Sequence, residues 1–474
     1  MIDLSPIKEQ LKGKPILVVG LGKSGLSVFE ACRKAGIETA LWDDNPEGRK
    51  QAEGMGAKLA DPAEADFSTY AFLCLAPGIP LTHPKPHLAV EKAKAAGIEV
   101  IGDIELFHRA KPKTKTICIT GTNGKSTTTA LVGHILRETG TPSAVGGNIG
   151  EAAMTLPDLE DGAIYIFEMS SYQADLCTTF QPGISILINL SADHIDRHGT
   201  MEGYVAAKER IFEGPGVAIV SMDDEYCLGV TERIRKKARR RVISVSVERP
   251  LTSGVFVSKE GVLFDGKDKV VNLNTCRSLQ GQHNWQNAAV AFAACREAGI
   301  PPADIVKGMQ SFAGLAHRQN IVTVIGGVPY INDSKATNDQ AAAMALRTFD
   351  PVYWIAGGRP KEGGWSECEK HLERVRHAFL IGEAEEEMAA WLQPKNVHHT
   401  RCGTLEKALE AAHRMAQEEK REQSVVLFSP ACASFDQFKN FEHRGEAFVA
   451  IVQKLKAETP IEPLPATAQQ GGAA

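Results

Sequence analysis

The sequence predicts an α/β protein of about three domains. Short β-branched runs alternate with helical stretches from end to end, which is typical of parallel sheets covered by helices. The chain has 474 residues, too many for a single hydrophobic core. Two strand–glycine–helix segments, at residues 16–25 and 117–127, each begin a new run of this alternation.

Composition and charge restrict the class of protein. Hydrophobic residues make up 43% and charged residues 23%, as in ordinary globular domains. The net charge is −5, and the longest basic block is 236–241, which we interpret as a solvated helix end. These values argue against a nucleic-acid partner.

Three features of the sequence predict the cellular compartment and exclude a membrane partner. No apolar run approaches the roughly 20 residues that span a bilayer, and the N-terminus does not resemble a signal peptide. The ten cysteines are scattered singly, as expected for reduced and mostly buried thiols. We therefore expect a cytoplasmic protein without a membrane partner, and we expect a monomer.

The first unit begins with a strand at Ile16–Val19 and a helix from about Ser24. Further strands are expected at 38–43 and 70–75. The Lys/Pro/Thr segment 111–116 then separates this unit from a new strand, so we place a domain boundary after residue 110.

The second unit contains strands at 117–120, near 163–168 and at 184–190, followed by a β-like stretch from about 217 to 275. It closes with a helix from about Asn284 to Ala298, because a glycine and then a proline follow as a stop signal.

A third unit begins after Gly314, where the strand–helix alternation restarts. The last residues, 458–474, are rich in Pro, Ala, Gln and Gly and have little to bury. We expect a disordered tail there.

The first glycine loop is Gly20-Leu21-Gly22-Lys23-Ser24-Gly25, which follows a strand and opens a helix, and Asp43 ends the next strand. Glycines at these positions let backbone N–H groups approach a diphosphate at a helix N-terminus. Three interpretations stay open from the residues alone: NAD in an oxidoreductase, a UDP-sugar whose diphosphate fits as well, or a tight turn without a ligand.

The second glycine loop is Gly121-Thr122-Asn123-Gly124-Lys125-Ser126-Thr127, between a strand and a helix. In such a loop backbone amides hold phosphate oxygens, Lys125 adds positive charge and Ser126 reaches Mg²⁺. The spacing departs from the common G-x-x-x-x-G-K-[ST] pattern because residue 119 is Ile, and a plain glycine-rich turn is the alternative. Two phosphate loops favour an enzyme that joins two phosphorylated substrates over a redox enzyme.

Oxygen and nitrogen ligands follow the next strands. Glu168 ends the strand at 164–168, and a carboxylate there suits Mg²⁺, which prefers oxygen. The segment 189–196 contains Asp193 and His194. An Asp-His pair is structural in most proteins, so its function stays open from the residues alone.

Lys208 lies on the apolar stripe of an expected helix. Met201, Val205, Lys208 and Phe212 recur at spacings of 4, 3 and 4. One interpretation is a lysine whose ammonium extends to the surface. The other is partial burial, which lowers the pKa and leaves a neutral amine that reacts with CO₂ to give a carbamate.

These motifs resemble the Mur ligase family, and the resemblance covers about residues 14–455. The shared segments are GTNGKST (121–127), GGNIG (146–150), FEMSSYQ (167–173), DHIDRHG (193–199) with Lys208, and GQHNWQNA (281–288). Within the family, NDSKATN (332–338) and FSPACASFDQFKNFEHRG (428–445) resemble the members that join D-glutamate to UDP-N-acetylmuramoyl-L-alanine.

The resemblance implies three α/β domains. These are a Rossmann-like N-terminal domain for the UDP-sugar (1–110), a central P-loop ATPase domain with a mixed sheet (111–314), and a Rossmann-like C-terminal domain for the amino acid (315–457). It also implies a reaction in which a carboxylate of the nucleotide substrate attacks the γ-phosphorus of ATP. The amine of D-glutamate then attacks the acyl phosphate, and phosphate leaves. ATP and Mg²⁺, the latter in two sites, are the expected cofactors.

The resemblance also implies roles for individual residues. The catalytic residues would be Lys125, Glu168, His194, Lys208 and Lys335. The ATP contacts would be Gly121, Thr122, Asn123, Gly124, Lys125, Ser126, Thr127, Asn284, Asn287, Arg318 and Asp333. The UDP-substrate contacts would be Gly20, Gly22, Lys23, Ser24, Asp43, Gly78 and Asn148. The D-glutamate pocket would be Thr337, Lys361, Ser434 and Phe441. The Mg²⁺ ligands would be Ser126, Glu168, His194 and Lys208 as its carbamate.

Two positions depart from the family pattern, namely Ala76, where a hydroxyl residue is common, and Asp44 beside Asp43. Two rival hypotheses remain. An NAD-dependent oxidoreductase would leave the loop at 121–127 and the third unit unexplained. A non-catalytic nucleotide-binding regulator would be expected to have lost some of the catalytic set, all of which is present.

Overall fold

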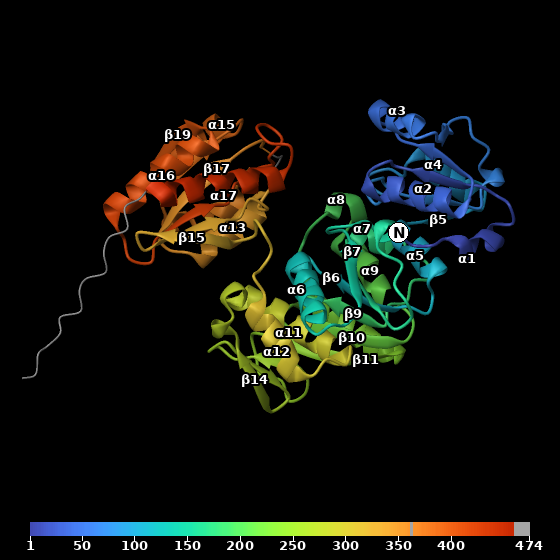
Figure 1. The fold of residues 1–474 in the computed structure, drawn as a ribbon, viewed down its shortest axis with the longest axis horizontal. Coiled ribbons are helices and arrows are strands. Elements are labelled where there is room, and N and C mark those ends of the chain that lie inside the picture. Colours follow the sequence, from blue (N-terminus) through green and yellow to red (C-terminus); the bar gives the residue numbers. More distant parts are fainter. Residues whose placement is uncertain (361–363, 459–474) are drawn as a thin grey trace, which may run out of the picture. The chain divides into compact units, whose positions relative to one another are not determined.

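The computed structural model describes residues 1–360 and 364–458. The chain divides into two compact units, Met1–Ala313 and a second unit that begins at Gly314. Three separate sheets carry the fold, two in the first unit and one in the second (Figure 1). The predicted α/β fold with three domains is confirmed. Most of the expected tail lies outside the described residues, but Glu458, which we assigned to it, ends the last helix.

The first sheet is parallel, with the strand order β3-β2-β1-β4-β5. Its strands are β1 (Ile16–Val19), β2 (Thr39–Trp42), β3 (Lys58–Leu59), β4 (Phe72–Leu75) and β5 (Glu99–Ile101). The longer helices around it are α2 (Lys23–Ala35), α3 (Pro46–Gly54), α4 (Leu88–Ala95) and α5 (Asp103–Ala110). All of β1 is buried because it lies in the middle of the sheet, and its carboxyl end leads into the first glycine loop.

The second sheet is mixed, with the order β14-β13-β12-β11-β10-β9-β6-β8-β7. Only β12, β13 and β14 make antiparallel pairs in it. Its strands are β6 (Lys115–Thr120), β7 (Ser143–Gly147), β8 (Ile164–Glu168), β9 (Ile184–Leu187), β10 (Gly216–Ser221), β11 (Arg240–Ser246), β12 (Val255–Val257), β13 (Val262–Asp265) and β14 (Asp268–Asn272). Its helices include α6 (Lys125–Glu138), α7 (Ser171–Asp175), α8 (Ile195–His198), α9 (Met201–Glu209), α10 (Glu225–Lys237), α11 (Gln282–Glu297) and α12 (Pro302–Ser311).

The third sheet has the order β15-β16-β20-β17-β18-β19, with β15 antiparallel to β16 and the other pairs parallel. Its strands are β15 (Asn320–Ile325), β16 (Val328–Asn332), β17 (Val352–Gly357), β18 (Val375–Ile381), β19 (His399–Gly403) and β20 (Val425–Phe428). Its helices are α13 (Asp339–Thr348), α14 (Ser366–Glu369), α15 (Glu385–Leu392), α16 (Leu405–Glu419) and α17 (Phe441–Glu458). The carboxyl ends of β16 and β20 lead into the segments that carry the predicted amino-acid contacts Thr337 and Ser434.

The basic block 236–241 is a solvated helix end as expected at Lys236 and Lys237, the exposed last residues of α10. The expectation is wrong for Arg240, and the expectation for the surrounding stretch is also wrong in part. The β-like stretch 217–275 also contains the full helix α10. Arg240, which we assigned to a solvated helix end, instead opens the buried strand β11 and is 6% exposed. Its guanidinium donates hydrogen bonds to the carbonyl oxygens of Phe212, Gly214 and Pro182. A loop that turns its carbonyls inward needs such donors, and sequence cannot show which arginine of a basic run provides them.

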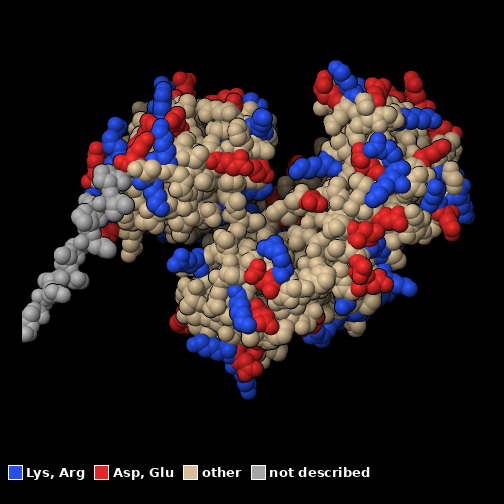
Figure 2. All heavy atoms as spheres, in the orientation of Figure 1, with Lys and Arg blue, Asp and Glu red and all other residues tan. Residues whose placement is uncertain are grey.

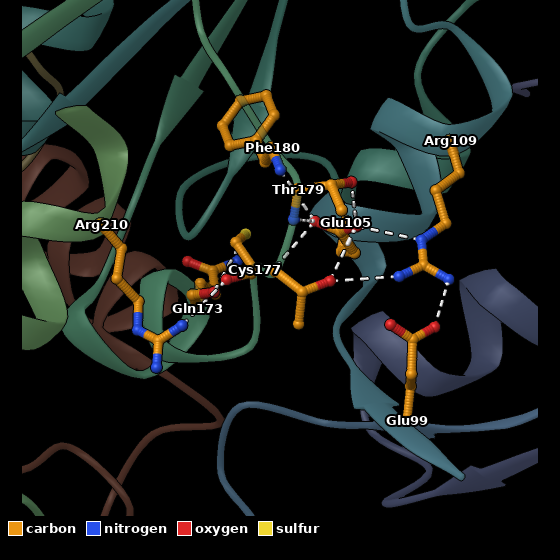
Figure 3. Close-up of polar contacts among 9 residues, drawn as sticks. Glu99, Glu105, Arg109, Gln173, Cys177, Thr179, Phe180 and Arg210 are labelled. Atoms are coloured by element: carbon orange, nitrogen blue, oxygen red, sulfur yellow. Dashed lines mark hydrogen bonds and ion pairs between the residues drawn. The ribbon is translucent and has the colours of Figure 1, made fainter. Parts of the chain in front are cut away.

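Glu105 on α5 joins the first domain to the loop that follows α7 (Figure 3). Its buried carboxylate accepts hydrogen bonds from three consecutive backbone N–H groups at 178–180, each at 3.0 Å, and from the Thr179 hydroxyl at 2.6 Å. Arg109 donates to the same carboxylate at 3.0 Å and to Glu99 at 2.9 Å. The contact therefore fixes α5 on the central domain within the first unit.

The described surface carries both signs of charge. Figure 2 shows Lys and Arg interspersed with Asp and Glu on the face in view. Nine of the ten cysteines are buried free thiols, and Cys402 is partly exposed, which agrees with the predicted reduced state. None of the helices in residues 1–360 and 364–458 is long and apolar enough to cross a bilayer.

Candidate active site

The second glycine loop connects β6 to the N-terminus of α6, as predicted. Gly124 has φ +83°, and a Cβ there would overlap Oδ1 of Asn287, so both backbone conformation and packing require glycine. Lys125 opens α6, and its Nζ donates to the carbonyl oxygens of Gly121 at 3.0 Å and Thr122 at 2.8 Å. The backbone N–H of Asn123 donates to Oδ1 of Asn189 at 2.8 Å. Lys125 at the start of α6 and Asn189 after β9 thus both hold the loop in place.

Glu168 lies beside this loop, because β6 and β8 are parallel neighbours that end at the same edge of the sheet. Its Oε1 accepts a hydrogen bond from Nδ2 of Asn148 at 2.8 Å. Its Oε2 is buried and makes no hydrogen bond. An orphaned carboxylate oxygen is unfavourable in a protein interior unless a cation binds it. Glu168 therefore fits the predicted role of Mg²⁺ ligand, and the predicted substrate contact Asn148 touches Glu168.

Lys208 is buried, 2% exposed, on α9. Its Nζ donates to the carbonyl oxygen of Gly121 at 2.8 Å and to the hydroxyl of Thr120 at 3.2 Å. Burial lowers its pKa well below the usual value, and the positive charge of Lys125 lowers it further. The structure thus brings Lys208 against the phosphate loop and favours its neutral amine.

His194 precedes α8 with the left-handed φ of +52°. Its imidazole lies 3.4 Å from the carboxylate of Asp193 and against the ring of Tyr172. Partial burial lowers the pKa of His194, and the positive charge of Lys125 lowers it further, whereas the negative charge of Asp193 raises it. A neutral imidazole is the form that binds a metal ion.

Two residues of the DHIDRHG segment that we did not single out also organise this edge. Nε2 of the buried His198 lies 2.9 Å from the Ser171 hydroxyl at the start of α7. The Arg197 guanidinium stacks on Tyr172, with its Cζ 4.4 Å from the ring centroid, and donates to the carbonyl oxygens of Gly78 and Ile79, both at 3.1 Å. Arg197 thereby links the histidine segment to the loop that carries the predicted UDP-substrate contact Gly78.

Asn284 and Asn287 share one face of α11, as their spacing predicts. Nδ2 of Asn287 donates to Oδ1 of Asn284 at 3.3 Å, and Oδ1 of Asn287 accepts from the Thr128 hydroxyl at 3.3 Å. Gln286, which we missed, accepts from Asn189 at 2.8 Å and so supports the phosphate loop indirectly. Its place inside the GQHNWQNA segment was the available signal.

The first glycine loop also has the predicted geometry. Gly20 has φ +92°, and Gly22 caps the helix α2 that begins at Lys23 and Ser24. Oδ2 of Asp43 accepts from the backbone N–H of Leu21 at 2.6 Å, so this carboxylate already braces the loop. A cavity of about 600 Å³ adjoins these residues, lined by Leu21, Gly22, Asp43, Asn45, Glu47, Gly48, Lys50 and Gln51.

Asp333 lies at the carboxyl end of β16 in the second unit. Its Oδ2 accepts from the Ser429 hydroxyl at 2.7 Å, and its Oδ1 accepts from the backbone N–H of Gln319 at 3.2 Å. Burial raises the pKa of Asp333 to about 7, although Ser429 and the nearby charge of Arg318 lower it. Ser429, 96 positions away, was not among the predicted residues.

Three predicted residues of the amino-acid pocket lie on described segments, while Lys361 lies outside the described residues. Nζ of Lys335 sits 4.0 Å from the centroid of the Phe441 ring. The backbone N–H of Thr337 donates to the carbonyl oxygen of Lys335 at 2.8 Å. Ser434 is buried in the segment after β20. The structure therefore brings Lys335 and Phe441 together.

Comparison with known proteins shows the family of the chain. Family profiles match residues 14–102 (Mur ligase MurD-like, N-terminal domain), 119–295 (Mur ligase middle domain) and 317–432 (Mur ligase, glutamate ligase domain). Two similar proteins are the UDP-N-acetylmuramoylalanine–D-glutamate ligases of Caulobacter sp. strain K31 and Rhizobium meliloti strain 1021. They are 48% and 46% identical to this chain, and each alignment covers 94% of this chain and 97% of the relative.

Solved structures share the fold. The UDP-N-acetylmuramate-alanine ligase MurC of Thermotoga maritima has a TM-score of 0.57 at 16% identity, over 94% of this chain and all of that chain. A MurF structure from Acinetobacter baumannii has a TM-score of 0.55 at 20% identity, over 74% and 79% of the two chains. With these matches, the resemblance found in the sequence motifs is confirmed: the chain belongs to the Mur ligase family.

Proposed function

We propose that this protein joins D-glutamate to UDP-N-acetylmuramoyl-L-alanine at the expense of ATP, as a cytoplasmic step of peptidoglycan precursor synthesis. The observation that carries the proposal is the match, over nearly the full length of the chain, to relatives named for this reaction. The phosphate loop, Glu168 and Lys208, which lie together in the first unit, are the parts that such a reaction needs.

The chemistry follows from the poor leaving-group quality of a carboxylate oxygen at neutral pH. The alanine carboxylate of the nucleotide attacks the γ-phosphorus of ATP and releases ADP, which gives an acyl phosphate. The amine of D-glutamate attacks the acyl carbon, loses a proton and displaces inorganic phosphate. Lys125 would offset the negative charge on the transferring phosphoryl group, since such transfer depends on positioning and charge stabilisation.

Two Mg²⁺ sites are part of the proposal. Ser126 and Glu168 would hold one ion, which accounts for the orphaned Oε2 of Glu168. His194 and a modified Lys208 would hold the second. Bound Mg²⁺ supplies positive charge to the phosphate oxygens and orients them for transfer. In the described residues no group of three or more His, Cys, Asp or Glu side chains is placed to hold a metal ion. Phosphate oxygens would therefore complete both sites, and the carbamate would provide oxygen ligands in the second.

A carbamate on Lys208 supplies the missing oxygen ligands. The neutral amine attacks the carbon of CO₂ and forms a C–N bond while one C=O π bond opens, and it releases a proton, which turns a neutral group into an anion with two oxygens. The observation in support is the burial of Nζ beside Thr120 and Gly121, where a free ammonium would repel Mg²⁺.

The remaining contacts keep the roles that the motifs imply. The first glycine loop, Asp43, Gly78 and Asn148 would hold the UDP-substrate. Asn284, Asn287, Arg318 and Asp333 would contact ATP, and Lys335 would act beside the reacting groups. Thr337, Lys361, Ser434 and Phe441 would bind D-glutamate.

Phosphate release tests the function directly. With ATP, Mg²⁺ and UDP-N-acetylmuramoyl-L-alanine, release should depend on D-glutamate and be far slower with L-glutamate. Lys125→Ala should lower the rate by roughly a thousandfold, because it removes a charge that stabilises phosphoryl transfer. Calorimetry should show that this variant still binds the UDP-substrate. Equal rates with both glutamate isomers, or no release at all, would contradict the proposed substrate.

The carbamate has a test of its own. Removal of CO₂ should lower the activity of the unmodified enzyme, and bicarbonate should restore it. Carbon-13 bicarbonate should give a carbamate signal in the NMR spectrum, absent in Lys208→Ala and retained in Lys307→Ala, a variant of an exposed lysine. Full activity without CO₂, and no such signal, would leave Lys208 as a simple charge partner.

A further inference from the structure

Arg444, on the first turns of α17, is a buried cation that the proposed reaction does not use. It is 1% exposed, and none of the ion pairs found in the described part of the chain involves it. Its guanidinium makes four hydrogen bonds, all to uncharged oxygens. Nε donates to the Ser334 hydroxyl at 3.1 Å, Nη2 to the carbonyl oxygens of Ser334 at 2.9 Å and Cys432 at 3.1 Å, and Nη1 to that of Ala433 at 3.2 Å.

These acceptors lie on two loops, one next to the predicted catalytic residue Lys335 and one next to the predicted D-glutamate contact Ser434. Ser334 belongs to the loop after β16, directly before Lys335. Cys432 and Ala433 belong to the loop after β20 and directly precede Ser434. The Ser334 hydroxyl in turn donates to the carbonyl oxygen of Phe441 at 2.8 Å. One guanidinium thus connects all the segments that carry the described residues of the proposed D-glutamate pocket.

The chemistry of arginine suits a side chain that holds two loops together. The carboxylate of Asp436 acts on the guanidinium electrostatically but makes no ion pair with it in the described residues, and burial of such a charge is unfavourable, so packing alone would favour an apolar residue. Burial lowers the pKa of Arg444 to about 10, and the group stays protonated at neutral pH. A planar guanidinium has donors in fixed directions, which can hold two loops at one separation, whereas an ammonium on a flexible chain cannot.

We propose that Arg444 is a positioning residue that holds the two loops of the D-glutamate pocket in one geometry and thereby sets affinity and stereoselectivity for that substrate. The inference rests on the proposed function. Discrimination between mirror-image amino acids requires that the binding groups stay within a fraction of an ångström of their places.

The ATP side of the same loop has anchors of its own. Asp333 is held by the Ser429 hydroxyl, by the backbone N–H of Gln319 and by a hydrogen bond from its own N–H to the carbonyl oxygen of Phe428. None of these contacts involves Arg444. Loss of the guanidinium should therefore raise the KM for D-glutamate far more than the KM for ATP.

The test is the full-length Arg444→Lys variant, which keeps the charge and loses the planar fork. The KM for D-glutamate should rise by about tenfold or more, the change expected from loss of one or two hydrogen bonds to a charged group. The ratio of the D- to the L-glutamate rate should fall. The KM for ATP should stay within about twofold, and so should acyl-phosphate formation without D-glutamate, trapped by borohydride reduction.

Two further variants separate positioning from general damage. Arg240→Lys is the matched control, because Arg240 is also buried and bonded to loop carbonyls, but in the first unit. It should lower thermal stability without a change in the D-to-L ratio. Ser334→Ala removes the hydroxyl that joins Arg444 to Phe441 and should shift the D-glutamate KM in the same direction, so the test survives if Arg444→Lys fails to fold.

The outcomes are distinct. Unchanged D-glutamate KM and D-to-L ratio in Arg444→Lys or in Ser334→Ala, with an active parent enzyme, would overturn the role of Arg444. A parallel rise in the KM for ATP would do the same, because it would show a general structural effect. A parent enzyme without D-glutamate-dependent phosphate release would overturn the proposed function instead.

Discussion

Asp333 shows how one buried carboxylate can set the pH dependence of a unit. In the folded chain its pKa is raised to about 7, against an ordinary value of 3.8. Below the ordinary value both states hold the proton, and the group has no effect on stability. As pH rises, the unfolded chain gives up the proton first, so the free energy of unfolding falls until pH passes about 7.

Asp333→Asn should therefore stabilise the second unit at pH 8, by roughly 4 kcal/mol at most, and by progressively less toward pH 4. Urea unfolding followed by tryptophan fluorescence checks this, because the indole of Trp354 donates to the carbonyl oxygen of Ser429, the partner of Asp333. Ser424→Ala, a buried serine in the same unit, is the control and should show no such pH dependence. If Asp333→Asn raised the free energy of unfolding equally at pH 5 and pH 8, the raised pKa of Asp333 would not be the cause of the stabilisation.

Single residues divide into those that a motif identifies and those that only the fold identifies. Lys125 follows a glycine loop, Glu168 ends a strand and Lys208 lies on an apolar helix stripe, so loop chemistry and spacing predict them. Ser429 and Arg444 act through partners roughly a hundred positions away, and no local pattern encodes such a contact. Lys208 was ambiguous because spacing places it on the apolar stripe but does not say how deeply its amine is buried.

At the scale of elements, the buried carboxylate of Glu105 holds α5 against the loop at 178–180. Burial raises the pKa of Glu105, but hydrogen bonds from Thr179 and Arg109 outweigh it and lower the pKa overall. The stabilisation is therefore present above the ordinary value of 4.5 and is lost as pH falls through the lowered pKa.

Glu105→Gln should lower the free energy of unfolding of the first unit by about 2–4 kcal/mol at neutral pH, since several hydrogen bonds to a buried charge are lost. Amide exchange at 178–180 should accelerate. Glu99→Gln is the matched control, because Glu99 pairs with the same Arg109 but is 55% exposed, and it should cost less than about 1 kcal/mol. Equal losses in the two variants would mean that Glu105 is no more than a surface ion pair.

Elements themselves were predicted unevenly. The strands that precede the glycine loops, and the helix from about residue 284, were predicted to within two residues, because strong turn and cap signals bound them. The region 217–275 was predicted only as β-like. Its helix α10 begins with Asp224 as the cap, whose side chain accepts from the N–H of Cys227, but its polar surface masks the helical period.

At the scale of the whole molecule, the second unit has its own sheet and its own buried clusters. A fragment from Gly314 onward should therefore fold alone with one cooperative transition by circular dichroism. A fragment of residues 1–313 should bind the UDP-substrate, yet neither fragment should release phosphate, because the proposed ATP contacts lie on both. If the fragment from residue 314 stays unfolded, the second unit is not stable without the first. The monomeric state and the domain boundaries at 110 and 314 stay predictions.

The position of Arg444 and Phe441 near the end of the chain has a consequence for protein synthesis. Both lie on α17, the last helix of the described chain, and every strand of the third sheet is made before it. A ribosome that stops before residue 441 releases a polypeptide that contains both phosphate loops but lacks the parts that organise the amino-acid pocket. Such a truncated product could bind nucleotide, but it would not complete an amide bond. We therefore expect incomplete translation to yield a protein that binds nucleotide but has no ligase activity.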